Sequence, residues 1–167
     1  MTKSLLTVTI LLFLTQAAIS QNSDNTKSCY SDKLFNKEKV FTKMLHKPYF
    51  KGGHDSFVNF LMANINFQKL VDDLSQNERL YSDTARIKFI VSKDGILSDL
   101  SITLTKKKIF ADEIARVIKK SSCNWVAGGT ERLINGWIQF DVYYLIDRQL
   151  NEVTTNVKVK EYDYADN

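Results

Sequence analysis

The sequence is poor in proline, histidine and cysteine, with one, two and two of them among 167 residues. The single proline, Pro48, excludes a proline-rich rigid spacer. His46 and His54 have no cysteine or carboxylate at metal-ligand spacing, so no metal site is predicted. Cys29 and Cys123 can form one bridge in an oxidising compartment, or remain two separate thiols, one of them buried.

Catalytic patterns are also missing. The pairs Gly52-Gly53 and Gly128-Gly129 lack the spacing and the lysine of a phosphate-binding loop. No serine or cysteine lies in a nucleophile elbow. The acidic pairs Asp72-Asp73 and Asp112-Glu113 are adjacent in sequence, which directs their side chains to different sides of a helix. We therefore expect a protein that is not an enzyme and has no cofactor.

The formal charge of +4 is spread along the chain. Apart from the triplet 106–108, which is typical of a solvated turn, lysine and arginine do not cluster. A nucleic-acid site needs clustered basic residues with interleaved aromatics. The sequence therefore predicts no nucleic-acid partner.

The first twenty residues resemble a signal peptide. Lys3 precedes an apolar run from Leu5 to Ala18, and small residues follow at 18–20. This predicts cleavage before Gln21 and a periplasmic or secreted protein. The alternative is an uncleaved segment that anchors the chain in the inner membrane, which is the only way in which we expect a membrane contact.

Composition divides the remainder of the chain into three parts. Residues 21–39 are polar and predict a flexible lead-in. Residues 40–147 carry the periodic apolar pattern of one domain. Residues 148–167 alternate only weakly and end in acidic residues, so we expect a mobile tail.

The stretch from Arg86 to Leu104 predicts a β-hairpin. Ile87, Phe89 and Val91 alternate with more polar residues before the Asp94-Gly95 turn, and a second alternating run follows. Glycine accepts a positive φ without steric cost, so Gly95 is expected in a left-handed conformation.

Two helices and a third strand complete the expected domain. Apolar residues at helical spacing predict helices over 57–65 and 110–120, and alternation predicts a strand over 137–146. Residues 67–83 predict a loop, a short helix and a second loop, and 40–45 form a candidate extra strand. The expected class is α+β: a three-stranded, mainly antiparallel sheet with two helices on one face.

With these elements placed, the chain resembles the C-terminal domain of TonB-family energy transducers. The similar segments are, in order, Val40-Phe41-Thr42, the entry from Pro48 to Gly53, the helix phrase FVNFLMANINF at 57–67, the hairpin from Phe89 to Asp99, the exit from Trp125 to Gly128, and Asn135-Gly136 before the last strand. They cover residues 40–146.

The resemblance implies a non-enzymatic periplasmic module that takes part in TonB-dependent transport. Such a module binds the TonB box of an outer-membrane transporter, or a peptide of another envelope protein, as an added strand at the edge of its last strand. In this sequence the peptide-binding residues would be Phe67, Gln68, Trp137, Gln139, Asp141, Tyr143 and Leu145.

Two other functions remain open at this point. A transducer has a membrane anchor and a long proline-rich spacer, whereas this chain has one proline, which favours a free module over an anchored transducer. Alternatively, the domain has lost transporter binding and is a structural or self-associating envelope protein. Its open strand edge would then form strand-paired homodimers.

Overall fold

The computed structural model describes residues 29–32, 39–74, 78–129, 131–149 and 152–162. The expected signal peptide and most of the expected lead-in therefore lie outside the described residues. Within them the elements run in the order β1 (Tyr30–Ser31), β2 (Val40–Phe41), β3 (Tyr49–Phe50), α1 (Gly53–Asn64), α2 (Phe67–Asp72), β4 (Leu80–Val91), β5 (Leu97–Thr103), α3 (Lys108–Lys120), β6 (Trp125–Val126), β7 (Gly128–Gly129), β8 (Leu133–Gln149) and β9 (Glu152–Glu161).

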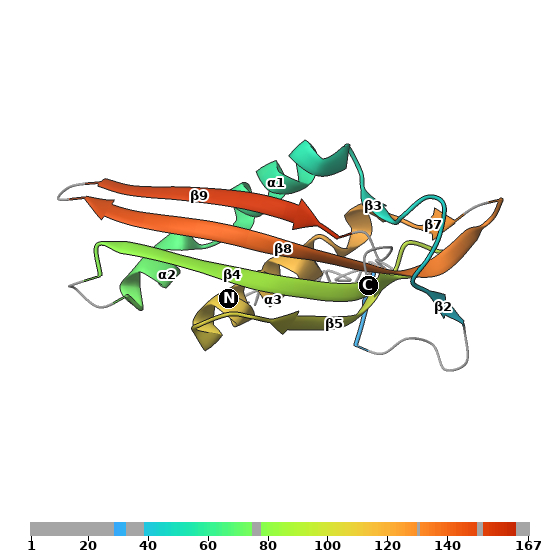
Figure 1. The fold of residues 1–167 in the computed structure, drawn as a ribbon, viewed down its shortest axis with the longest axis horizontal. Coiled ribbons are helices and arrows are strands. Elements are labelled where there is room, and N and C mark those ends of the chain that lie inside the picture. Colours follow the sequence, from blue (N-terminus) through green and yellow to red (C-terminus); the bar gives the residue numbers. More distant parts are fainter. Residues whose placement is uncertain (1–28, 33–38, 75–77, 130, 150–151, 163–167) are drawn as a thin grey trace, which may run out of the picture.

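A long mixed sheet dominates the fold (Figure 1). The strand order is β1-β5-β4-β8-β2, and β9 and β7 also pair with β8. Strands β4 and β8 are antiparallel from the pair Leu80–Asp147 to the pair Val91–Gly136. Strand β9 is antiparallel to β8 along its other side. A second sheet consists of β3 and β6.

The expected three-stranded sheet with two helices is wrong. The described residues form an α+β fold with nine strands, seven of them in one mixed sheet, and three α-helices. Strand β4 extends back to Leu80. Tyr81, Asp83 and Ala85 face the helices and are buried, whereas Ser82 and Thr84 face the opposite side. The sequence did not predict this part of the strand because polar residues stand on both of its faces.

The tail also differs from the expectation. Residues 148 and 149 belong to β8, and β9 follows where a mobile segment was expected. Val157 is 5% exposed and Val159 is partly buried against the core, whereas Lys158 between them is exposed. One buried face is sufficient to hold an edge strand, although its other face remains polar.

The hairpin turn agrees with the sequence. Strand β4 pairs with β5 across the turn, and Gly95 has φ +78°, which confirms the expected left-handed conformation. A Cβ atom at this position would also lie 2.9 Å from the carbonyl oxygen of Trp125. The turn therefore requires glycine for its backbone angle and for its close packing.

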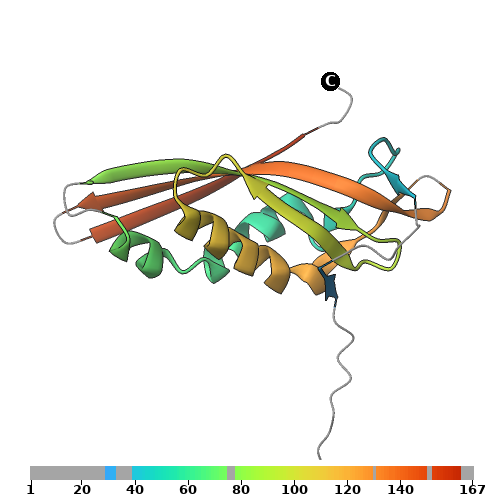
Figure 2. The same cartoon turned by 90° about the horizontal axis from the view of Figure 1, so that it is seen from below.

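The three helices cover one face of the large sheet and leave the other face open (Figure 2). Between the layers lies a cluster of aromatic rings. The Trp125 ring centroid is 5.2 Å from that of Phe57 and 4.9 Å from that of Phe89, and Phe57 and Phe140 are 5.1 Å apart. The indole Nε1 of Trp125 donates to Ser121 Oγ at 2.9 Å. This cluster joins α1 to the centre of the sheet.

The two cysteines, for which the sequence left both states open, form a disulfide. The Cα atoms of Cys29 and Cys123 are 5.1 Å apart. Directly after Cys29, β1 pairs in parallel with the start of β5, and Leu97 N donates to the carbonyl of Cys29 at 2.8 Å. The bridge therefore holds the N-terminal described segment against the β5 edge and the end of α3.

Replacing Phe140 with alanine should lower the free energy of unfolding by about 3–5 kcal/mol, because the ring is buried among three others and leaves a cavity. Its neighbour Gln139 projects to the open face, so Gln139→Ala should change stability by less than about 0.5 kcal/mol. Urea denaturation measures both. Equal effects of the two substitutions would contradict the assignment of the faces.

Replacing both cysteines with serine should lower the free energy of unfolding by about 4 kcal/mol, because the bridge closes a loop of 94 residues in the unfolded chain. Thermal unfolding with and without reductant measures the same effect in the unmodified protein. Two titratable thiols in the denatured, unreduced protein would show that the bridge is not formed.

Candidate functional site

Five of the residues proposed to bind a peptide lie on the open face of the sheet. In β8 the side chains of residues 138, 140, 142, 144 and 146 are buried toward the helices. The alternating residues, Trp137, Gln139, Asp141, Tyr143 and Leu145, therefore project from the opposite face. The five residues that the sequence predicted to bind a peptide in this strand therefore share one face.

The backbone of β8 is hydrogen-bonded on both sides. Tyr162 N donates to the carbonyl of Gln139 at 3.2 Å, which places the odd-numbered residues of β8 in hydrogen-bonded pairs with β9. Arg148 N donates to the carbonyl of Arg79 at 2.7 Å, which places the even-numbered residues in such pairs with β4. The stretch of β8 from residue 140 to 147 thus offers no edge to a further strand.

The other two proposed residues lie elsewhere. Phe67 begins α2 and packs against the core. Gln68 Nε2 donates to Asp72 Oδ1 at 2.7 Å within the same helix. Helix α2 belongs to the layer that covers the buried face (Figure 2). The structure therefore does not bring Phe67 and Gln68 together with the open-face residues of β8.

On the far side of β8 the sheet ends at β9, which pairs only with β8 among the described residues. Because Lys158 and Lys160 stand opposite Tyr143 and Asp141 in hydrogen-bonded pairs, the N–H and C=O groups of Val157 and Val159 point away from β8. Sequence analysis missed this edge. The alternation of Val157 and Val159 with lysines was its only signal.

A groove of about 600 Å³ lies beside this edge. Residues 157–159 of β9 form one wall, and His54, Asp55, Val58 and Asn59 of α1 form the other. We call this space the edge groove. His54 Nδ1 is 3.7 Å from Glu161 Oε1, so an ion pair between α1 and β9 marks one end of it when His54 is protonated.

The C-terminal end of β9 is fastened to the open face. The guanidinium of Arg86 donates to both carboxylate oxygens of Asp141 at 2.9 and 3.0 Å. The hydroxyl of Tyr162 donates to Asp141 Oδ2 at 2.7 Å, and Lys47 Nζ donates to the carbonyl of Tyr162 at 2.8 Å. Residue 162 therefore joins β4, β8 and the segment before β3.

Asp141 is 2% exposed. Burial by itself raises the pKa of Asp141, but the hydrogen bonds from Arg86 and Tyr162 outweigh it and hold this pKa below its usual range. The aspartate is therefore charged at neutral pH and has its partners already in place. It fastens β9 to the sheet and is not free to pair with a ligand.

Metal-ligating residues do not gather in the part of the chain that the structure describes: no three histidine, cysteine, aspartate or glutamate side chains form a group there. His46 pairs with Gly129 through its backbone in an isolated bridge. Within the same residues, no helix has the length and apolar character needed to span a bilayer.

Comparison of the chain with protein-family models, with curated proteins and with solved structures gives no match.

Replacing Arg86 with methionine should lower the free energy of unfolding at pH 7 by about 2 kcal/mol, because Asp141 then remains buried without its charged partner. In the native protein the folded-state pKa of Asp141 is lowered, so its stabilising contribution is complete above the pKa of the unfolded state and is lost as the pH falls through the lower pKa of the folded state.

Without Arg86, burial favours the protonated form of Asp141. The difference in stability between the two proteins should therefore shrink as the pH falls from 7 to 3. Urea denaturation across this range measures it. Arg79→Met serves as the control, because the exposed Arg79 only approaches Asp147 at 3.8 Å. A difference that stays constant with pH would contradict the assigned role of Asp141.

Proposed function

We propose that the protein is a non-enzymatic binding module of the cell envelope that receives an extended peptide as an added strand. The chain's resemblance to TonB C-terminal domains makes a TonB box, or a similar peptide of an envelope protein, the expected ligand. The observation that carries the proposal is the outer edge of β9, where the backbone groups of Val157 and Val159 point into the edge groove. This edge replaces β8 as the receiving strand.

In strand addition the β9 backbone and the α1 wall of the edge groove have different roles. A peptide antiparallel or parallel to β9 would satisfy the outward N–H and C=O groups of Val157 and Val159, which provides affinity without sequence preference. Alternate peptide side chains would point toward α1, where Val58 is flanked by His54 and Asn59. An apolar side chain next to a small polar one fits this wall.

Two features support an envelope location. Residues 1–20 have the pattern of a cleaved signal peptide. Independently, the Cys29–Cys123 disulfide requires an oxidising compartment such as the periplasm or the extracellular space.

The same edge could pair with a second copy of the chain, which is the self-associating alternative. Lys158 and Lys160 are exposed on either side of Val159, and lysines on an edge strand oppose pairing between identical edges. A different peptide that lacks this charge meets no such repulsion. The charges therefore favour a heterologous partner over a homodimer.

Titration of a synthetic TonB-box peptide into ¹⁵N-labelled protein tests the proposal. We expect amide shifts at residues 155–161 of β9 and 54–59 of α1. The mass measured by light scattering should increase by no more than one bound peptide. Shifts confined to other parts of the sheet, or none at millimolar peptide, would reject the edge groove as the site. A concentration-dependent dimer would favour self-association instead.

Val157→Pro should abolish this binding or weaken it about tenfold, because it removes an outward N–H while the ladder to β8 uses the neighbouring residues. Val157→Ala keeps the N–H and controls for loss of the side chain. Unchanged binding by the folded proline variant, as judged by circular dichroism and the amide spectrum, would show that the peptide does not add to β9.

A further inference from the structure

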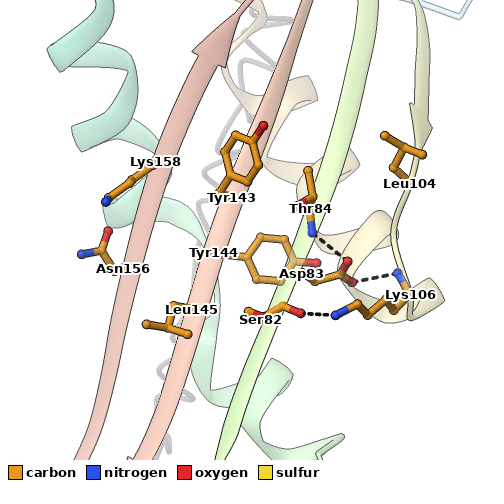
Figure 3. Close-up of a pocket in the computed structure, with 10 residues that line it drawn as sticks. All are labelled: Ser82, Asp83, Thr84, Leu104, Lys106, Tyr143, Tyr144, Leu145, Asn156 and Lys158. Atoms are coloured by element: carbon orange, nitrogen blue, oxygen red, sulfur yellow. Dashed lines mark hydrogen bonds between the residues drawn. The ribbon is translucent and has the colours of Figure 1, made fainter.

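A hollow of about 420 Å³ lies on the open face of the sheet, away from the helices (Figure 3). It extends from β9 across β8 and β4 to the segment that follows β5. Strand β5 pairs with β4 only as far as the pair Arg86–Thr103, so beyond this point the chain at residues 104–106 forms the far wall. The side chains around it include Thr84, Leu104, Lys106, Tyr143, Leu145 and Lys158.

The lining is apolar and exposed. Leu104 is 57% exposed, Leu145 39% and Tyr143 38%, and all three border the hollow. Leu104 also has φ +63°, a conformation that is unfavourable for a leucine. Several large apolar side chains together on the surface, around a concavity, are typical of an interaction site.

The rim of the hollow is positively charged. Lys158 projects from β9 on one side and Lys106 from the segment after β5 on the other (Figure 3). The one carboxylate among the lining residues, Asp83, already accepts hydrogen bonds from Tyr81 Oη and from the backbone N–H groups of Thr84 and Lys106. The described residues contain no ion-pair partner for Lys158. The lining therefore carries two lysines against one carboxylate, a net charge of +1.

Cations and aromatic rings continue along the same face beyond the hollow. Lys88 Nζ lies 4.5 Å from the ring centroid of Trp137, and Lys160 Nζ lies 5.3 Å from that of Tyr162. An extended acidic chain could contact several of these positions, whereas a small anion would use only one.

We propose that the open face binds an acidic segment of a partner protein. An aromatic or branched aliphatic side chain of that segment occupies the hollow against Tyr143, Leu104 and Leu145. Carboxylates next to it pair with Lys158 and Lys106. A second copy of this chain is a poor occupant, because face-to-face pairing would oppose the same lysines. A membrane surface is flat and would leave the concavity unfilled.

The inference rests on the proposed function only in that both assume a protein partner. The two surfaces share one lining residue, Lys158, and all their other lining residues differ: the edge groove is formed by α1 and residues 157–159 of β9, and the hollow by the face of β4, β8 and β9 with the segment after β5. Each surface can therefore fail its test while the other one passes.

The probe is an acetylated octapeptide that alternates glutamate with phenylalanine and leucine, and its analogue carries glutamine in place of glutamate. Titration into the ¹⁵N-labelled full-length mature protein should shift amides at residues 82–84, 104–106 and 143–145. The glutamine analogue should bind at least about tenfold more weakly than the acidic peptide, and added salt should weaken binding of the acidic peptide.

Two substitutions sharpen the test. Lys158→Gln should weaken binding of the acidic peptide about threefold, which is the effect of losing one exposed ion pair. Lys120→Gln makes the same charge change on α3 and should leave this binding unchanged. Tyr143→Ala should weaken both peptides by a similar factor, because it removes part of the apolar wall. Tyr143→Ala should not affect binding of the TonB-box peptide, because Tyr143 does not line the edge groove.

Four results would overturn the inference. The first is the absence of amide shifts at the hollow, and the second is equal binding of the two octapeptides. The third is shifts confined to α1 and the outer side of β9, a result that leaves the proposed function intact. The fourth is that vesicles of anionic phospholipid produce the same shifts when the acidic octapeptide produces none, which would identify the face as a membrane-binding surface.

Discussion

The pairing of β8 on both of its sides is the constraint on which the architecture depends. Its even-numbered residues are bonded to β4 and its odd-numbered residues to β9, so the strand cannot move without breaking both ladders. The same alternation directs Phe140 into the aromatic cluster and Asp141 onto the open face. One strand therefore fixes the core, the fastening of residue 162 and the position of the β9 edge.

Local chemistry made part of this fold predictable. The alternation around Phe89 and Val91, with Gly95 at the turn, identifies the hairpin because side-chain period and turn geometry are both properties of neighbouring residues. Helix α3 has its apolar residues on one face for the same reason. Pairing between distant strands leaves no such trace, so nothing near Trp137 or Tyr143 reveals which strand lies beside them.

The site was only partly predictable. The open-face residues of β8 were assigned correctly to one face, but their strand was taken for an edge because β9 was not recognised. Val157 and Val159 alternate with two lysines, a pattern that is equally typical of a solvated segment. Phe67 and Gln68 were placed near the peptide by resemblance alone, and the structure puts them in the helical layer. The hollow was not foreseen, because its lining residues come from four separate segments.

The late position of β8 in the chain also affects how the protein folds. Arg86 and Asp141 are neighbours in the sheet but lie far apart in sequence, and long-range pairing of this kind slows folding. The β4–β5 and β8–β9 hairpins are local and can form early, yet each leaves apolar side chains exposed until the two meet. Until the two hairpins meet, the chain keeps a β-rich apolar surface open, and binding by a chaperone would be most useful in that interval.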